Sequence, residues 1–160
     1  MSRDVGVPVA ASAGRPVAHL FALEHEGLRR LARLLTGSDA MAEDLVQEAF
    51  VRLQASTTSP ANPGGYLRTV LVNLCRDHLR REARTRHQAV AVPLVAVPPE
   101  LDETWAAVCR LPFRQRAAVV LRYYQDLPEA EIANLLGCRP GTVKSSLSRA
   151  LAKLRKELSP

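Results

Sequence analysis

Apolar residues recur at helical spacing through the first half of the chain and predict three helices. The first begins near Val17 and ends before Gly37, a residue suited to a helix stop. Asp39 is the expected N-cap of the second helix, and a Pro- and Ser-containing loop over 55–64 separates it from a third helix over about 65–86. The apolar faces are Leu20, Phe21, Leu23, Leu28, Leu31, Leu34 and Leu35; Met41, Leu45, Val46, Ala49, Phe50 and Leu53; and Leu67, Val70, Leu71, Leu74 and Leu79.

The second half repeats this pattern after a break. Residues 87–99 contain three prolines and no Asp, Glu, Lys or Arg, so they are predicted to form a linker. Four further helices are expected, over 100–111, 113–124 and 129–136 and from Pro140 onward. The sequence therefore predicts an all-α fold of two small helical bundles joined by a flexible linker, with a disordered tail over 1–16, a first domain over 17–86 and a second over 100–160.

Composition narrows the function classes. The 160 residues hold 22 Lys and Arg against 16 Asp and Glu, a formal net charge of +6. The basic residues gather at the end of each predicted domain, over 76–86 and 139–156, which is a candidate footprint for a polyanion. A solvated helix face explains either run alone equally well.

No motif in the sequence indicates a membrane protein, a secreted protein, a metalloprotein or an enzyme. No stretch approaches the ~20 apolar residues of a membrane span, and Pro8, Gly14 and Pro16 interrupt any signal-peptide core, so we expect a cytoplasmic protein without membrane insertion. The three cysteines lack metal-ligand spacing, which predicts reduced thiols and no metal. There is no phosphate-binding Gly loop, Ser/His/Asp set or HExxH motif, so we expect no enzyme activity, no catalytic residue and no cofactor.

The strongest local motif lies in residues 129–149. A short apolar helix carries a small residue, Ala133, where a second helix must cross closely, and Gly137 follows at the turn. The next helix begins near Pro140, and this register predicts a helix-turn-helix that places its second helix in the DNA major groove. A helical hairpin that serves only packing is the alternative. The outward residues, expected to contact DNA, are Arg139, Thr142, Lys144, Ser145, Ser148 and Arg149.

Three stretches together resemble the extracytoplasmic-function (ECF) sigma factors of bacterial RNA polymerase. They are LLTGSDAMAEDLVQEAF at 34–50, GYLR followed by VLVNLCRD within 65–77, and LPFRQRAAVVLRYY at 111–124, which leads into the helix-turn-helix. Their order and spacing make the resemblance specific and extend it over about residues 21–158. The chain looks most similar to the actinobacterial SigE-like subfamily.

The resemblance implies roles for both domains. The first is similar to sigma region 2, whose acidic helix face docks on the β′ clamp of the polymerase core. The second is similar to region 4, which reads the minus-35 promoter element, with Arg122 as a further contact, and meets the β flap. Nucleotide transfer then belongs to the polymerase. The core-binding residues implied are Glu43, Asp44, Gln47 and Glu48, and those implied for recognition and melting of the minus-10 element are Asn62, Tyr66, Arg68, Asn73, Arg76, Asp77 and Arg80.

The sequence departs from the family pattern at the start of the second helix of the motif. Arg139 stands where a capping Ser or Thr is usual, which predicts a loss of ~1 kcal/mol of helix stability. Pro140 and Ser146 also differ from the common residues, Ser146 replacing a frequent Arg. An autonomous helix-turn-helix regulator is the alternative function, although it would have no need of region 34–86. An anti-sigma factor is a further partner implied by the resemblance alone.

Overall fold

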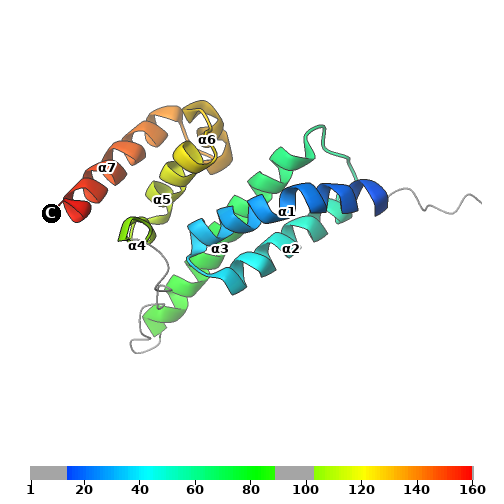
Figure 1. Cartoon of the computed structure of the whole chain (residues 1–160), viewed down its shortest axis with the longest axis horizontal. Coiled ribbons are helices and arrows are strands. Elements are labelled where there is room, and N and C mark those ends of the chain that lie inside the picture. Colours follow the sequence, from blue (N-terminus) through cyan, green and yellow to red (C-terminus); the bar gives the residue numbers. More distant parts are fainter. Residues whose placement is uncertain (1–13, 89–102, 160) are drawn as a thin grey trace, which may run out of the picture.

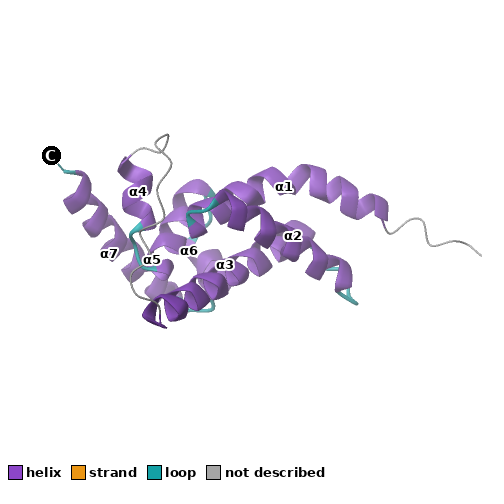
Figure 2. Cartoon of the chain, turned by 90° about the horizontal axis from the view of Figure 1, so that it is seen from below, coloured by secondary structure: helices purple, strands orange, loops and turns teal. Residues whose placement is uncertain are grey.

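The computed structural model describes residues 14–88 and 103–159, and within these ranges it contains helices and no strand. Figures 1 and 2 show the helices grouped at two ends of an elongated molecule. The elements are α1 (Gly14–Thr36), α2 (Asp39–Ala55), α3 (Pro63–Gln88), α4 (Glu103–Cys109), α5 (Phe113–Val119), the π-helical turn η1 (Val120–Tyr124), α6 (Glu129–Leu136) and α7 (Pro140–Leu158). The all-α prediction of two bundles is confirmed.

The first bundle consists of α1, α2 and α3, which pack on one another along their apolar faces. The helices are amphipathic because apolar residues three and four positions apart fall on one side. Their buried side chains are mainly leucines, and Leu31, Leu35, Leu67 and Leu71 are fully enclosed. This packing leaves the opposite faces of α2 and α3 available for polar residues.

The second bundle is built around α7, which packs against α4, α5 and α6. Ile132 and Leu136 of α6 and Val143, Leu147 and Leu154 of α7 are buried. The predicted helix over 113–124 is present, but its second half is a π-helical turn instead of an α-helix. The amide of Gln125 bonds the carbonyl of Val120 and that of Leu127 bonds Leu121, so the chain turns here into α6.

The two bundles share one continuous hydrophobic core. The buried guanidinium of Arg116 in α5 spans the junction: it donates to the carbonyl of Leu35 in α1 at 2.6 Å, to that of Leu111 at 3.2 Å and to that of Cys109. The Arg33 guanidinium of α1 lies 5.9 Å from the ring centre of Trp105 in α4. The carbonyls at the end of α1 attract a cation, so Arg116 ties the second bundle to the first.

The turn residues agree with the sequence at two positions and differ at one. Gly37 and Gly137 have φ of +80° and +62°, the left-handed conformation expected after α1 and α6. The expected cap at Asp39 is wrong. Ser38 is the N-cap of α2 and its side chain accepts from the amide of Met41, while Asp39 lies in the first turn and pairs with Arg29 and Arg33. A first-turn carboxylate can stabilise the helix without accepting the capping bond.

Three helix boundaries lie outside the predicted ranges. α1 begins at Gly14, three residues before the expected start, with Pro16 in its first turn where proline is tolerated. α3 begins at Pro63 and reaches Gln88, so two residues of the predicted linker are helical. The rest of that linker and residues 1–13 of the predicted tail lie outside the described residues. None of the described helices is long and apolar enough to cross a membrane.

Candidate nucleic-acid interface

The helix-turn-helix is formed by α6 and α7. Ala133 is buried at the crossing, and the Cys138 amide donates to its carbonyl to close the turn at Gly137. Arg139 occupies the N-cap position of α7 and its side chain makes no capping bond, as the sequence predicted, while Pro140 takes the first helical position. Proline has no N–H to satisfy there, so Pro140 reduces the number of donors that the missing cap leaves open.

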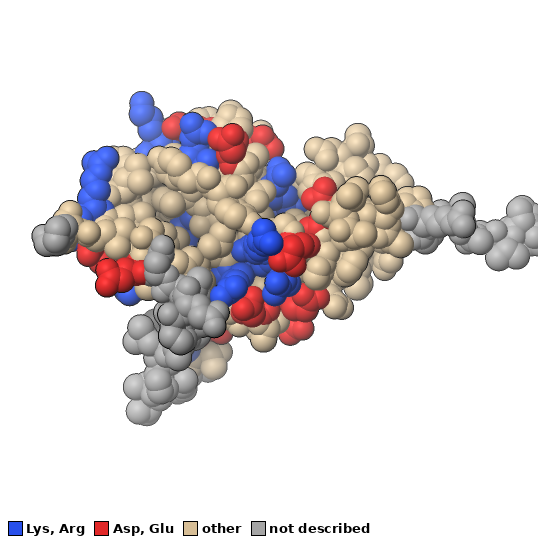
Figure 3. All heavy atoms as spheres, viewed as in Figure 1, with Lys and Arg blue, Asp and Glu red and all other residues tan. Residues whose placement is uncertain are grey.

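The outer face of α7 is open to solvent. Arg139, Lys144, Ser148 and Arg149 are exposed, and none has a hydrogen-bond or ion-pair partner among the described residues. In Figure 3 basic side chains project from the end of the molecule where α7 lies. Thr142 is half-buried, and Ser145 is exposed and donates to the carbonyl of Thr142 at 3.0 Å. Unpaired cations on an exposed helix face can approach phosphates and guanine edges without first breaking an internal bond.

Two residues near this face have other roles in the fold. Arg122 donates to the carbonyl of Leu127 at 3.1 Å and so braces the turn between η1 and α6. Ser146 is buried against the bundle, with 6% of its surface exposed. The departure from the family pattern at Ser146 therefore lies on the inner side of α7 and leaves the outer face unaltered.

The start of α3 carries the first residues expected at the minus-10 element. Asn62 accepts the amide of Gly65 at 3.0 Å with its side chain, and its carbonyl accepts the amide of Tyr66 at the same distance. Asn62 thereby acts as a cap, and the loop predicted over 55–64 ends at Asn62 because α3 already begins at Pro63. Tyr66 is half-buried.

Three of the remaining minus-10 candidates, Arg68, Arg76 and Arg80, lie where α3 meets the second bundle. Arg68 pairs with Glu131 of α6 at 3.5 Å. Arg76 and Arg80 line a cavity whose other wall is formed by α5 and the end of α6. Asn73 is half-buried, and Asp77 is exposed with a carboxylate oxygen 3.8 Å from Nε of Arg76. In this arrangement the second bundle covers part of the surface that the sequence assigned to DNA.

The acidic face of α2 contains the four residues expected to bind polymerase, and three of them already interact. The Glu43 carboxylate lies 2.9 Å from Nε2 of His25 and 3.1 Å from the side-chain nitrogen of Gln47, and these hydrogen bonds lower the pKa of Glu43. Glu48 pairs with Arg52 at 2.7 Å. Asp44 is exposed and has no partner among the described residues. The face is therefore an ordered polar surface with one free carboxylate.

Sequence reasoning missed Arg116 and His25. Burial lowers the pKa of the Arg116 guanidinium, and its position between the bundles comes from tertiary packing that no local pattern encodes. His25 stacks on Phe21 with ring centres 4.5 Å apart and reaches the acidic face from α1. The helical spacing of Phe21 and His25 could have indicated that contact.

Comparisons with known proteins agree with this arrangement. The family described as Sigma-70 region 2 matches residues 20–85, and Sigma-70 region 4 matches residues 101–154. The chain is 37% identical over 151 residues to the ECF RNA polymerase sigma factor SigM of Mycobacterium tuberculosis, covering 87% of this chain and 75% of SigM. It is 32% identical to the RNA polymerase sigma-E factor of Streptomyces avermitilis, covering 83% and 79% of the two chains. The chain belongs to the ECF RNA polymerase sigma factors.

A solved structure extends the match to three dimensions. The sigma factor RpoE from Bartonella quintana, crystallised with the anti-sigma factor NepR, superposes with a TM-score of 0.75 at 28% identity and covers 90% of this chain and 97% of its own. An ECF sigma factor of this kind is an alternative sigma factor that takes RNA polymerase to promoters, so the predicted function is confirmed.

Proposed function

We propose that the two bundles of this sigma factor divide promoter recognition between them. The second bundle reads the minus-35 element as duplex through Arg139, Thr142, Lys144, Ser145, Ser148 and Arg149 of α7 and its cap. The first bundle binds the opened minus-10 element along α3. The observation that carries the proposal is the outer face of α7, the second helix of the helix-turn-helix. Lys144 and Arg149 are exposed there and are not paired with any other part of the chain that the structure describes.

The minus-10 role is assigned to α3 because its polar residues suit unstacked bases. The amide of Asn73 can bond base edges, and the guanidinium groups of Arg76 and Arg80 can bind single-strand phosphates. Capturing unstacked bases offsets the free energy of lost pairing and stacking, so DNA opens without ATP. Asn62, Tyr66, Arg68 and Asp77 lie along the same helix and its cap and complete the surface.

The acidic face of α2 is the surface proposed to grip the polymerase core at the β′ clamp. Asp44 provides a free carboxylate for a basic partner, and Glu43, Gln47 and Glu48 form the ordered surround. Arg122 supports the minus-35 surface indirectly through its bond to Leu127. The protein acts in the cytoplasm and is itself no enzyme, since nucleotide transfer is performed by the polymerase. An anti-sigma factor, the partner of RpoE in its crystal structure, is a proposed regulator.

Binding to core polymerase separates this function from that of an autonomous regulator. The chain should co-elute with core polymerase in gel filtration and support transcription from a matched promoter. Failure to co-elute would favour the autonomous regulator.

Replacement of Asn73 tests the division of labour between the bundles. Asn73→Ala removes an amide proposed to hold an unstacked base, so promoter opening should fall about fivefold or more, as expected for one lost base contact. Permanganate reactivity measures opening, and binding to the closed promoter at low temperature should change less than twofold. Equal loss of closed binding and opening would contradict the assignment.

A further inference from the structure

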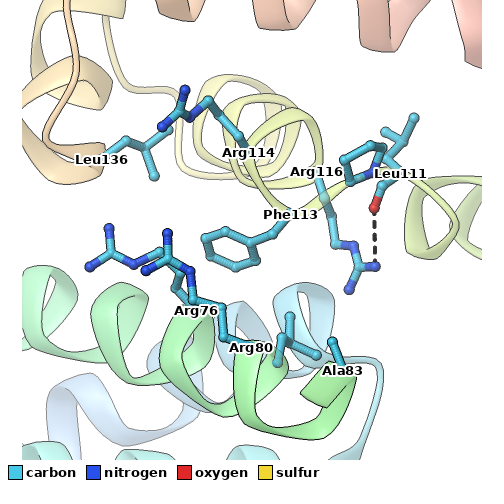
Figure 4. Close-up of a pocket in the computed structure, with 10 residues that line it drawn as sticks. Arg76, Arg80, Ala83, Leu111, Phe113, Arg114, Arg116 and Leu136 are labelled. Carbon is cyan, nitrogen blue, oxygen red and sulfur yellow. Dashed lines mark hydrogen bonds between the residues drawn. The ribbon is translucent and has the colours of Figure 1, made fainter. Parts of the chain in front are cut away.

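A cavity of about 520 Å³ lies between the two bundles. One wall is α3 and the other is formed by α5, the turn before it and the end of α6. Figure 4 shows Arg76 and Arg80 extending from α3 beside the ring of Phe113, with Arg114 and Leu136 on the far wall. The volume falls within the ~300–1,000 Å³ of small-ligand sites.

The described lining contains four arginines and no carboxylate. The two terminal nitrogens of Arg116 donate to three backbone carbonyls, although its Nε is buried without a hydrogen bond. Arg80 and Arg114 have no hydrogen-bond or ion-pair partner among the described residues. Nε of Arg76 is buried without a hydrogen bond, and the nearest carboxylate, that of Asp77, is 3.8 Å away. These arginines come from both bundles and repel one another because they carry the same charge. An anion placed between them would therefore stabilise the packing of one bundle against the other.

The other half of the lining is apolar. The Phe113 ring is only half-buried although it packs against the core, and Leu79, Leu111 and Leu136 surround the same space. Inorganic phosphate would use the arginines and leave this apolar surface open to water. A planar ring carried by the same anion would cover it, because aromatic rings stack on Phe and on guanidinium planes.

We propose that this cavity binds a small phosphorylated nucleotide. Its phosphates would lie between Arg76 and Arg80 of α3 and Arg114 of α5, and its base would lie against Phe113. The ligand would thereby link the two bundles and occupy two arginines assigned to the minus-10 element. The binding step goes beyond the proposed promoter recognition and does not depend on it.

Isothermal titration of the full chain at about 0.15 M salt, where exposed charge pairs are screened, measures the binding directly. ATP should bind at least about fivefold more tightly than tripolyphosphate, because base stacking adds to the phosphate contacts. Arg114→Ala should weaken ATP binding about tenfold or more through loss of a charge-assisted hydrogen bond. Phe113→Leu should reduce the preference of the site for ATP over tripolyphosphate.

Arg84→Ala is the matched control, since Arg84 is an exposed arginine of α3 outside the cavity lining. Its ATP affinity should equal that of the parent chain, and circular dichroism should show each variant folded. The proposal would be overturned if the chain bound no ATP, or if it bound ATP and tripolyphosphate with equal affinity. It would also be overturned if Arg114→Ala and Arg84→Ala weakened ATP binding equally. Tighter binding of a single-stranded oligonucleotide than of ATP, with loss on Arg114→Ala, would also overturn it by assigning the cavity to DNA. Promoter recognition would survive any of these results.

Discussion

The outer face of α7 and the inner side of α3 both carry residues assigned to DNA, yet the fold treats them differently. On α7, Lys144 and Arg149 extend from a face that no other described helix covers, and neither has a partner among the described residues. On α3, Arg68 is paired with Glu131, and Arg76 lines the cavity against the second bundle. The face proposed to read the minus-35 element is therefore open in the free chain, whereas the face proposed to bind the minus-10 element would gain its full area only when the bundles move apart.

The largest expected effect comes from removing the two exposed cations on the outer face of α7. Lys144→Ala combined with Arg149→Ala should weaken minus-35 duplex binding by about 2–4 kcal/mol, since a base or phosphate contact contributes ~1–3 kcal/mol. Promoter-dependent transcription should fall by the fold-change that corresponds to this loss of binding free energy. Co-elution with core polymerase should be retained. The control is Arg84→Ala combined with Arg86→Ala, which removes the same charge from two exposed arginines of α3 that are not among the residues proposed to contact either promoter element. Unchanged transcription in the α7 variant would show that α7 is not the reading helix.

The next effect concerns the hydrogen bonds by which Arg116 of α5 holds the second bundle against α1 of the first. Arg116→Met should lower the free energy of unfolding by about 2–3 kcal/mol in urea, because the carbonyls of Leu35, Cys109 and Leu111 lose a buried donor. Arg110→Met is the control, since Arg110 is exposed and Glu157 is its one ion-pair partner within 14–88 and 103–159. Its substitution should lower the free energy of unfolding by less than ~1 kcal/mol. A loss below 1 kcal/mol for Arg116→Met would mean that the Arg116 hydrogen bonds contribute little to the junction between the bundles.

The contrast also shows what the sequence could predict. Helix number, approximate boundaries and the outer face of α7 follow from periodicity and from glycines that stop helices, because these are local properties of the backbone. Gly137 illustrates this, since a φ of +62° is a requirement of the turn itself.

The contacts between the two bundles could not be predicted from the hydrophobic periodicity of the sequence. The Arg116 bond to Leu35 and the Arg68 pair with Glu131 join residues far apart in the sequence, and their geometry depends on how two separately predictable bundles dock. The predicted N-cap of α2, Asp39, was wrong for a local reason. Ser38 and Asp39 are adjacent and both suit an N-cap, and only the backbone conformation selects Ser38.

The turns that orient α6 and α7 should respond in opposite directions to two substitutions. Asp126 has φ of +52°, so Asp126→Gly should relieve strain and stabilise the chain by up to ~1 kcal/mol. Gly137→Ala should cost about 1 kcal/mol, and that cost is strain alone because an added Cβ would meet no atom within 4 Å. Thermal unfolding measures both. Equal shifts of the same sign would contradict the role of these two turns.

The smallest expected effect separates the two DNA surfaces most directly. Glu131→Gln removes the charge that pairs with Arg68, and an exposed pair of this kind contributes ~0.2–1 kcal/mol. Binding of a single-stranded minus-10 oligonucleotide to the free chain should therefore tighten by up to about fivefold, measured by fluorescence anisotropy. Glu129→Gln makes the same charge change on α6 at a residue without a described partner, so it corrects for the altered net charge. If both variants tighten single-strand and duplex binding equally, the gain is long-range electrostatics, and Arg68 is as available in the free chain as Lys144 is.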